Sequence, residues 1–162
     1  MPSVAVQTEI VALADAPHLV PVVARWHWEE WGAADPAGSL TTWTDGLRAR
    51  SLRDRVPMSW VALVAGVPAG SVALIECDMV THPELTPWLS GLLVLPAYRQ
   101  HGLGSALTAH CEAAAAALGV RRMYLYTDES AGFYAKRGWS PIATEWYEGA
   151  LKTLMLKDLD SG

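Results

Sequence analysis

Apolar residues recur at two different spacings along the chain, and these spacings predict its helices and strands. Between His18 and Trp31, and again between Gly102 and Leu118, apolar side chains fall every three or four residues, as on one face of a helix. Shorter helices are expected at Leu40–Leu52, where Ser39 is a candidate N-cap, and at Ser130–Arg137. Asp15 is a candidate N-cap for the first helix.

Shorter apolar runs, rich in β-branched residues and bounded by Gly or Pro, predict seven strands. A strand, a helix and another strand follow one another in the middle of the chain, so part of the sheet should be parallel, whereas hairpins on either side should be antiparallel. The predicted strands are Val4–Leu13, Trp60–Ala65, Gly70–Glu76, Trp88–Leu95, Arg122–Thr127, Trp139–Tyr147 and Leu151–Lys157.

The resulting order is β-α-α-β-β-β-α-β-α-β-β. It predicts an α/β protein (α+β in some schemes) with a mixed, mostly antiparallel seven-stranded sheet flanked by helices. The sequence contains no internal repeat and no low-complexity linker. We therefore expect a single domain over residues 1–162.

The charge and cysteine content exclude several classes of partner. Lys and Arg number 12 against 17 Asp and Glu, and no basic block occurs, so duplex nucleic acid is not expected to bind. Cys77 and Cys111 are far apart, and the histidines show no metal-binding spacing, so neither a disulfide nor a metal site is expected. No apolar stretch reaches the length of a membrane span, and we expect a cytoplasmic protein.

The segment from Leu92 to Ser105 carries the clearest chemical signal. An apolar strand runs into a basic, glycine-containing turn that opens a long helix. The first N–H groups of a helix have no internal partners, and Gly102 and Gly104 allow a phosphate to approach the backbone closely. A dinucleotide fingerprint would need a third glycine where Leu107 stands, and a Walker motif is absent. Two alternatives remain: this segment is an anion site, or it is a helix start that binds nothing.

The run Arg99-Gln100-His101-Gly102-Leu103-Gly104 resembles the R/Q-x-x-G-x-G/A signature of the GNAT acetyltransferases, and the preceding Val94-Leu95-Pro96-Ala97-Tyr98 resembles the strand end of that family. The resemblance implies acetyl-CoA as cosubstrate. It implies that the strand pairs with the pantetheine arm through Leu93 and Val94. It implies a pyrophosphate held by Gln100, His101, Gly102, Gly104 and Ser105, and Arg99 adds a positive charge beside them.

A second motif, from Ala131 to Trp139, resembles the A-x-x-F-Y-x-x-x-G-F/W segment of the same family. In that family the tyrosine often protonates the leaving thiolate, which implies this role for Tyr134. The family commonly has an Asn where this chain has Thr127. The general base is open: Glu76 is our choice, and Asp78, Glu29 and Glu30 are alternatives.

The two motifs together predict direct transfer of an acetyl group from acetyl-CoA to a primary amine. The acceptor is a small amine, an antibiotic, or an amine of a peptide or protein, and the sequence does not choose among them. Four tryptophans around the first two predicted helices either line the acceptor site or pack the core: Trp26, Trp28, Trp31 and Trp43. Homodimers are frequent in the family and are a further expectation. The alternatives are a domain that senses acyl-CoA without turnover and a nucleotide-binding domain of another class.

Overall fold

The computed structural model describes residues 7–159, which form seven strands and four α-helices in the predicted order. Short 3₁₀ turns precede and follow α1, and another follows β4. The strands are β1 (Thr8–Ala12), β2 (Met58–Val64), β3 (Val67–Ile75), β4 (Trp88–Val94), β5 (Arg122–Thr127), β6 (Ser140–Tyr147) and β7 (Ala150–Asp158). The helices are α1 (Val20–Trp31), α2 (Leu40–Ala49), α3 (Leu103–Ala117) and α4 (Ala131–Ala135).

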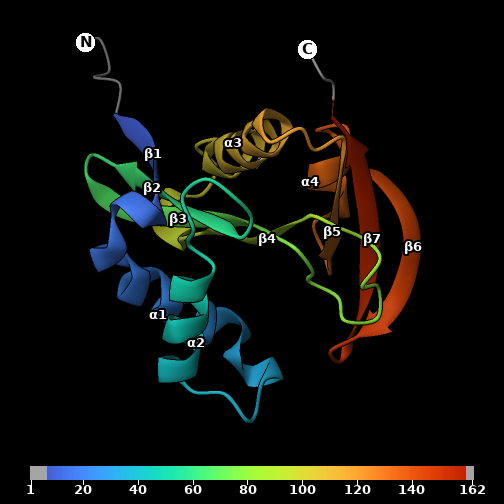
Figure 1. The fold of residues 1–162 in the computed structure, drawn as a ribbon, viewed down its shortest axis with the longest axis horizontal. Helices are drawn as coiled ribbons and strands as arrows, with labels where there is room; N and C mark the ends of the chain where they lie inside the picture. The colour runs from blue at the N-terminus through green and yellow to red at the C-terminus, as the bar shows by residue number, and fades with distance from the viewer. Residues whose placement is uncertain (1–6, 160–162) are drawn as a thin grey trace.

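The strands form one sheet in the order β1-β2-β3-β4-β5-β7-β6. Every neighbouring pair is antiparallel except β4 and β5, which are parallel because α3 crosses over between them. The predicted fold class is thereby confirmed. Figure 1 shows the consequence: β1 to β4 form one half of the sheet, β5 to β7 form the other, and the halves meet at β4 and β5.

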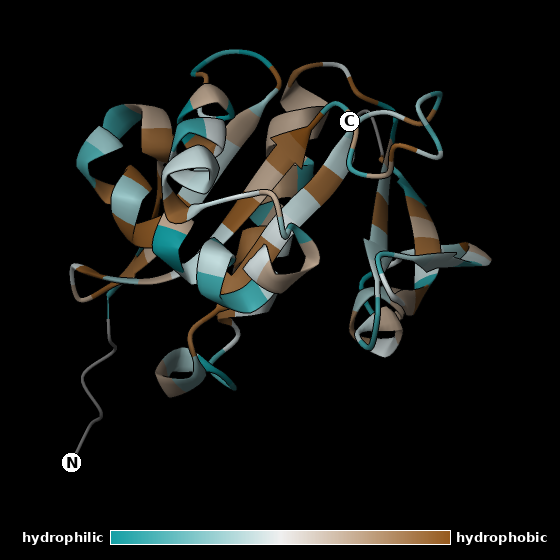
Figure 2. Cartoon of the chain, turned by 90° about the horizontal axis from the view of Figure 1, so that it is seen from below, coloured by the Kyte–Doolittle hydropathy of each residue, from teal (hydrophilic) through white to brown (hydrophobic). Residues whose placement is uncertain are grey.

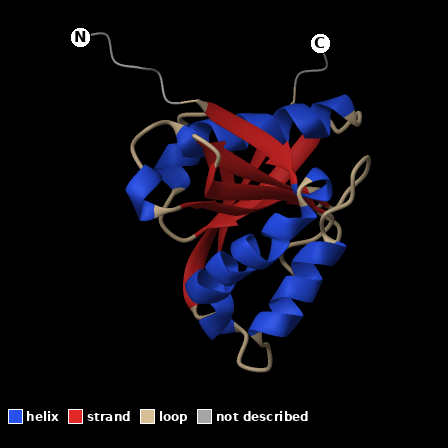
Figure 3. Ribbon diagram, turned by 90° about the vertical axis from the view of Figure 1, so that its left-hand side faces the viewer, coloured by secondary structure: helices blue, strands red, loops and turns tan. Residues whose placement is uncertain are grey.

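Helices cover both faces of the sheet (Figure 3). On one face α3 and α4 close the largest core cluster, in which Leu107, Cys111 and Tyr134 pack against strand residues such as Leu125. On the other face α1 and α2 pack on the first half of the sheet through a second cluster that contains Val23. A third cluster lies under the connection from β3 to β4 and is centred on the buried Trp88.

The hydropathy pattern of the structure agrees with this layering. Figure 2 shows apolar residues concentrated on the central strands, while the helices alternate between apolar and polar segments. None of the helices formed by residues 7–159 is both long enough and apolar enough to span a membrane.

The start of the first helix differs from the prediction. Asp15 is not its N-cap, because two 3₁₀ turns intervene and the cap position is Leu19, which provides no side-chain hydrogen bond. Asp15 instead forms an ion pair with Arg53. The Ser39 cap is confirmed: its side chain accepts a hydrogen bond from the Thr42 N–H at 3.1 Å. The first predicted strand began at Val4, and its first three residues lie outside the described part of the chain.

Candidate functional site

The sheet opens between its two halves, and this opening defines the site. β4 and β5 pair only at Trp88 and Tyr124, near the start of β4. A bulge follows on β4, where Gly91 has a φ of 62° that glycine adopts without strain. Beyond it, β4 has no neighbouring strand on the β5 side. Backbone N–H and C=O groups that point toward this side can therefore pair with an extended ligand.

A short hydrogen-bonded chain holds the bulge in place. The Ser71 hydroxyl donates to the Gly91 carbonyl at 2.9 Å, and the His27 Nε2 lies 2.9 Å from the same hydroxyl. Burial, helped by the positive charge of Arg50, lowers the pKa of His27 to about 4. His27 is therefore neutral at physiological pH and anchors α1 to β4 where the sheet separates.

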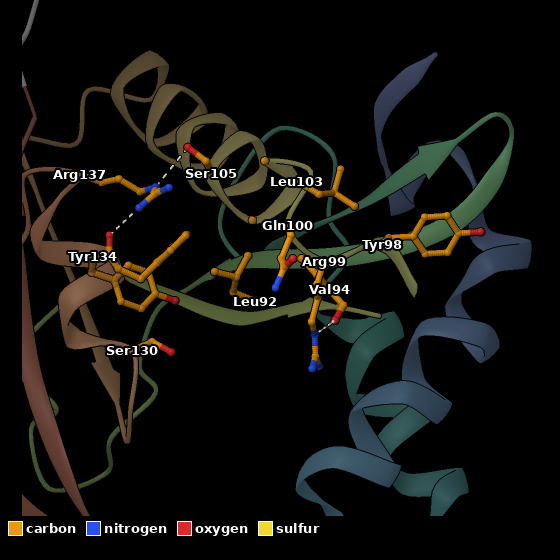
Figure 4. A pocket seen from close by; sticks show the side chains of 13 residues that line it. Leu92, Val94, Tyr98, Arg99, Gln100, Leu103, Ser105, Ser130, Tyr134 and Arg137 are labelled. Carbon is orange, nitrogen blue, oxygen red and sulfur yellow. Dashed lines mark hydrogen bonds between the residues drawn. The ribbon is translucent and has the colours of Figure 1, made fainter. Parts of the chain in front are cut away.

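A cavity of about 480 Å³ fills the opening on the α3 side of β4 (Figure 4). Its size is that of a ligand pocket rather than a packing defect. Residues from β4, the turn before α3, α3 itself and α4 contribute to it. They are Leu92, Val94, Tyr98, Arg99, Gln100, Gly102, Leu103, Gly104, Ser105, Ser130, Phe133, Tyr134 and Arg137.

The N-terminus of α3 faces this cavity. Gly102 is the N-cap, with φ of 77°, and Gln100 in the same turn has φ of 67°. The first helical hydrogen bond is donated by the Ala106 N–H to the Gly102 carbonyl, so the three N–H groups between them have no acceptor in the helix. A methyl group on Gly104 would meet Phe133 at 3.5 Å, which is ordinary contact. The helix end therefore offers free N–H groups with little side-chain cover, which is the arrangement that an anion requires.

Arg137 adds a positive charge to this helix end and was missed by the sequence analysis. Its Nε donates to the Ser105 hydroxyl at 3.1 Å, and its Nη1 donates to the Phe133 carbonyl at 2.7 Å (Figure 4). The guanidinium also lies 3.7 Å from the centre of the Phe133 ring. These contacts fix the guanidinium beside the first turn of α3, where it can pair with a phosphate.

The structure brings together most, though not all, of the residues expected to hold acetyl-CoA. Val94 and Arg99 line the cavity together with four predicted residues of the turn and helix, Gln100, Gly102, Gly104 and Ser105. The Arg99 Nε donates to the Val94 carbonyl at 2.9 Å. Leu93 pairs with Ser71 of β3 and does not line the cavity; its neighbour Leu92 does. His101 is exposed and also lies outside the lining.

Tyr134 stands at the α4 side of the cavity. Its hydroxyl points into the cavity in Figure 4, whereas its ring is packed among apolar side chains. Burial raises the pKa of the phenol well above its usual value, and the nearby Cys111 adds to the effect. Tyr134 therefore keeps its proton at neutral and moderately alkaline pH and can donate it to a group in the cavity.

The two acidic residues at the end of β3 occupy different places. Glu76 is exposed and lines a separate hollow with Arg50 and Cys77. Asp78 is more enclosed and lies against Ser90 of β4. Burial raises the pKa of Asp78 to about 6, although Ser90 and Arg50 act in the opposite direction. Of these two carboxylates, Asp78 is the one that contacts the strand bordering the cavity.

Most of the tryptophans near α1 and α2 pack those helices. The rings of Trp28 and Trp43 meet edge to face at 5.9 Å, and the Trp43 indole N–H donates to Asp35 at 2.8 Å. Trp26 packs against the second core cluster. Trp31 is partly exposed, and its ring centre lies 5.1 Å from that of His27.

Thr127 has a structural partner at the position where the family commonly has Asn. Its hydroxyl accepts a hydrogen bond from the Ser130 N–H at 3.0 Å, immediately before α4. The side chain thus stabilises the turn that leads into the helix of Tyr134.

Comparisons with known proteins agree with this architecture. The sequence profile of the Acetyltransferase (GNAT) family matches residues 20–139. No curated protein matches the chain by sequence. Among solved structures, an aminoglycoside 6'-N-acetyltransferase in complex with coenzyme A superimposes with a TM-score of 0.74 at 15% identity, over 93% of this chain and 96% of that one.

Two further structures show the same fold. A GNAT-family acetyltransferase of Streptococcus pneumoniae gives a TM-score of 0.69 at 18% identity, over 95% of this chain and 100% of that one. The structure of yncA from Salmonella typhimurium, which contains its cofactor acetyl-CoA, gives 0.69 at 18% identity, over 96% and 95% of the two chains.

Proposed function

The chain belongs to the GNAT acetyltransferase family, and we propose that it transfers an acetyl group from acetyl-CoA directly to a primary amine. The observation that carries this proposal is the cavity in the sheet opening, because one space contains an unpaired strand edge, a helix N-terminus and the Tyr134 hydroxyl. The complexes of similar structures with coenzyme A and acetyl-CoA support the same donor.

The three parts of the cavity match the three parts of acetyl-CoA. The pyrophosphate suits the N-terminus of α3, where free N–H groups and Arg137 offer hydrogen bonds and positive charge. The pantetheine arm, an extended chain with amide groups, suits the free edge of β4 beside Leu92 and Val94. The thioester would then lie between β4 and Tyr134.

The chemistry follows from this placement. The amine loses a proton to a base, its lone pair attacks the thioester carbonyl, and a C–N bond forms. A backbone N–H of β4 near Val94 is the proposed donor to the resulting oxyanion. The C–S bond then breaks, and the thiolate takes its proton from Tyr134. Tyr134 recovers a proton from the remaining N–H⁺ of the product through solvent, so one proton is released per acetyl group transferred.

The test is release of free CoA from acetyl-CoA across a panel of small amines, aminoglycosides and peptides, detected as a new thiol. Transfer to one acceptor class, with mass spectrometry showing acetyl on its nitrogen, is the expected result. Tight binding of acetyl-CoA without transfer to any amine in the panel would favour an acyl-CoA sensor instead. Failure to bind acetyl-CoA at all would contradict both.

A further inference from the structure

A second hollow, of about 310 Å³, lies between the end of α2 and the end of β3. Arg50, Pro57, Ile75, Glu76 and Cys77 line it. Its volume is within the range of small-molecule sites. Arg50 is the C-terminal cap of α2, and Glu76 and Cys77 begin the connection from β3 to β4. The hollow therefore lies beside the end of β3, the strand that pairs with β4 of the acetyl-CoA cavity.

Arg50 is available to a ligand in this hollow. Its side chain is exposed, and within residues 7–159 it takes part in no ion pair. The neighbouring Arg48, by contrast, pairs with Asp45 on the outer side of the same helix at 3.6 Å. A free guanidinium offers two parallel N–H donors, which is the geometry that a carboxylate accepts.

Asp78 follows Cys77, a lining residue of the hollow, and lies against β4, the strand that borders the acetyl-CoA cavity. Its carboxylate lies against Ser90 of β4, close enough to Arg50 for that charge to favour the ionised form. Tyr126 of β5 and Glu148 of the β6–β7 turn approach it from the other half of the sheet. Leu92, two residues beyond Ser90, lines the acetyl-CoA cavity, and two strand residues span roughly 7 Å.

We propose that this hollow binds the acceptor, and that the acceptor is an amino acid whose carboxylate pairs with Arg50 while its ammonium group faces Asp78. This inference rests on the proposed function, since it names the substrate of the same reaction. The positive charge of Arg50, which acts on Asp78, and the negative charge of Asp78 match the two charges of an amino acid. An amine without an acidic group would leave Arg50 unmatched.

The role of Asp78 follows from its position. The ammonium group transfers one proton to the Asp78 carboxylate, and the free amine then attacks the thioester held along β4. Ionised Asp78 is required, so turnover should rise with pH through about 6, the raised pKa of this carboxyl. The groups that face Asp78 are Arg50, Glu148, Tyr126 and Tyr147, and among them Arg50 supplies the compensating positive charge.

The experiment compares the common amino acids with their carboxamides, which keep the amine and lose the carboxylate. We expect kcat/KM for the preferred amino acid to exceed that of its amide by roughly tenfold or more, as charged hydrogen bonds commonly produce. In Arg50→Gln this ratio should fall to about one, whereas Arg48→Gln should keep the wild-type ratio. Asp78→Asn should lower turnover of amino acid and amide alike and remove the rise near pH 6.

The outcomes separate this inference from the proposed function. Acetylation of amines with no preference for the carboxylate, or a preference that survives in Arg50→Gln, overturns the inference and leaves the acetyltransferase proposal standing. If no amine is acetylated, binding of amino acids in the presence of CoA is followed by tryptophan fluorescence. If amino acids then do not bind, or bind equally well to Arg50→Gln, the inference is overturned as well.

Discussion

Replacement of Tyr134 by Phe removes one hydroxyl from the cavity and leaves the ring. The ring packs edge to face on Phe133 at 5.1 Å and on Trp139 at 6.1 Å, and Phe can keep both contacts. The hydroxyl points toward the cavity, not into the core (Figure 4). The free energy of unfolding should therefore change by less than about 1 kcal/mol, within the range of conservative replacements.

The effect on catalysis should be much larger. A positioned proton donor typically contributes about 10²–10⁴-fold, which corresponds to roughly 3–5 kcal/mol of the activation free energy. Burial and the nearby Cys111 hold the pKa of Tyr134 above its usual value, so wild-type kcat should not fall from loss of this proton below about pH 10. We expect kcat in Tyr134→Phe to fall at least ~100-fold at pH 7.5.

The assay is thiol release under saturating acetyl-CoA, together with a calorimetric titration of the variant with acetyl-CoA. Tyr124→Phe is a matched control, because this tyrosine packs on Trp88 at the point where β4 and β5 still pair. A fall in kcat of less than about fivefold in Tyr134→Phe, with acetyl-CoA affinity unchanged, would refute the assignment and leave Tyr134 as a packing residue.

Further predictions concern the cofactor site and a partly buried ion pair. Gly104→Ala should raise the melting temperature slightly, because helix interiors favour Ala and the added methyl group meets Phe133 only at ordinary contact distance. It should nevertheless weaken acetyl-CoA binding at least tenfold in calorimetry, because the methyl group would lie where we propose that the phosphate approaches the backbone. Arg137→Gln should weaken the same binding about tenfold and reduce its salt dependence; an unchanged salt dependence would remove Arg137 from the phosphate site. Glu112→Gln should lower the urea-unfolding free energy by about 1–3 kcal/mol, since Lys157 then loses its 2.6 Å partner in a partly buried site, whereas Glu29→Gln at an exposed pair should change it by less than about 0.5 kcal/mol.

The element order could be predicted because each element carries its own local signal. The helix of Gly102–Leu118 has apolar residues at helical spacing and glycine at both ends, and the structure has α3 at Leu103–Ala117. The strand Arg122–Thr127 agrees at both ends. The cap at Asp15 was wrong because a local pattern does not reveal a tertiary partner: the side chain pairs with Arg53, 38 residues away.

The same difference between local signals and tertiary contacts decides which parts of the candidate site could be predicted. The glycines of the α3 turn could be predicted, since their use is local: they free the backbone of a helix start. Arg137 could not, because its contact with Ser105 joins residues 32 positions apart in the sequence. The difference between Glu76 and Asp78 also escaped prediction, because two residues in one connection have the same local context, and only packing brings Asp78 against Ser90.

The most direct test of the account is a calorimetric titration of the protein with acetyl-CoA, beside parallel titrations with NAD and ATP. We expect one acetyl-CoA site per chain, with an affinity greater than that for either nucleotide and reduced in Gly104→Ala. Absence of acetyl-CoA binding, or tighter binding of NAD or ATP, would contradict the assignment of this cavity to acetyl-CoA.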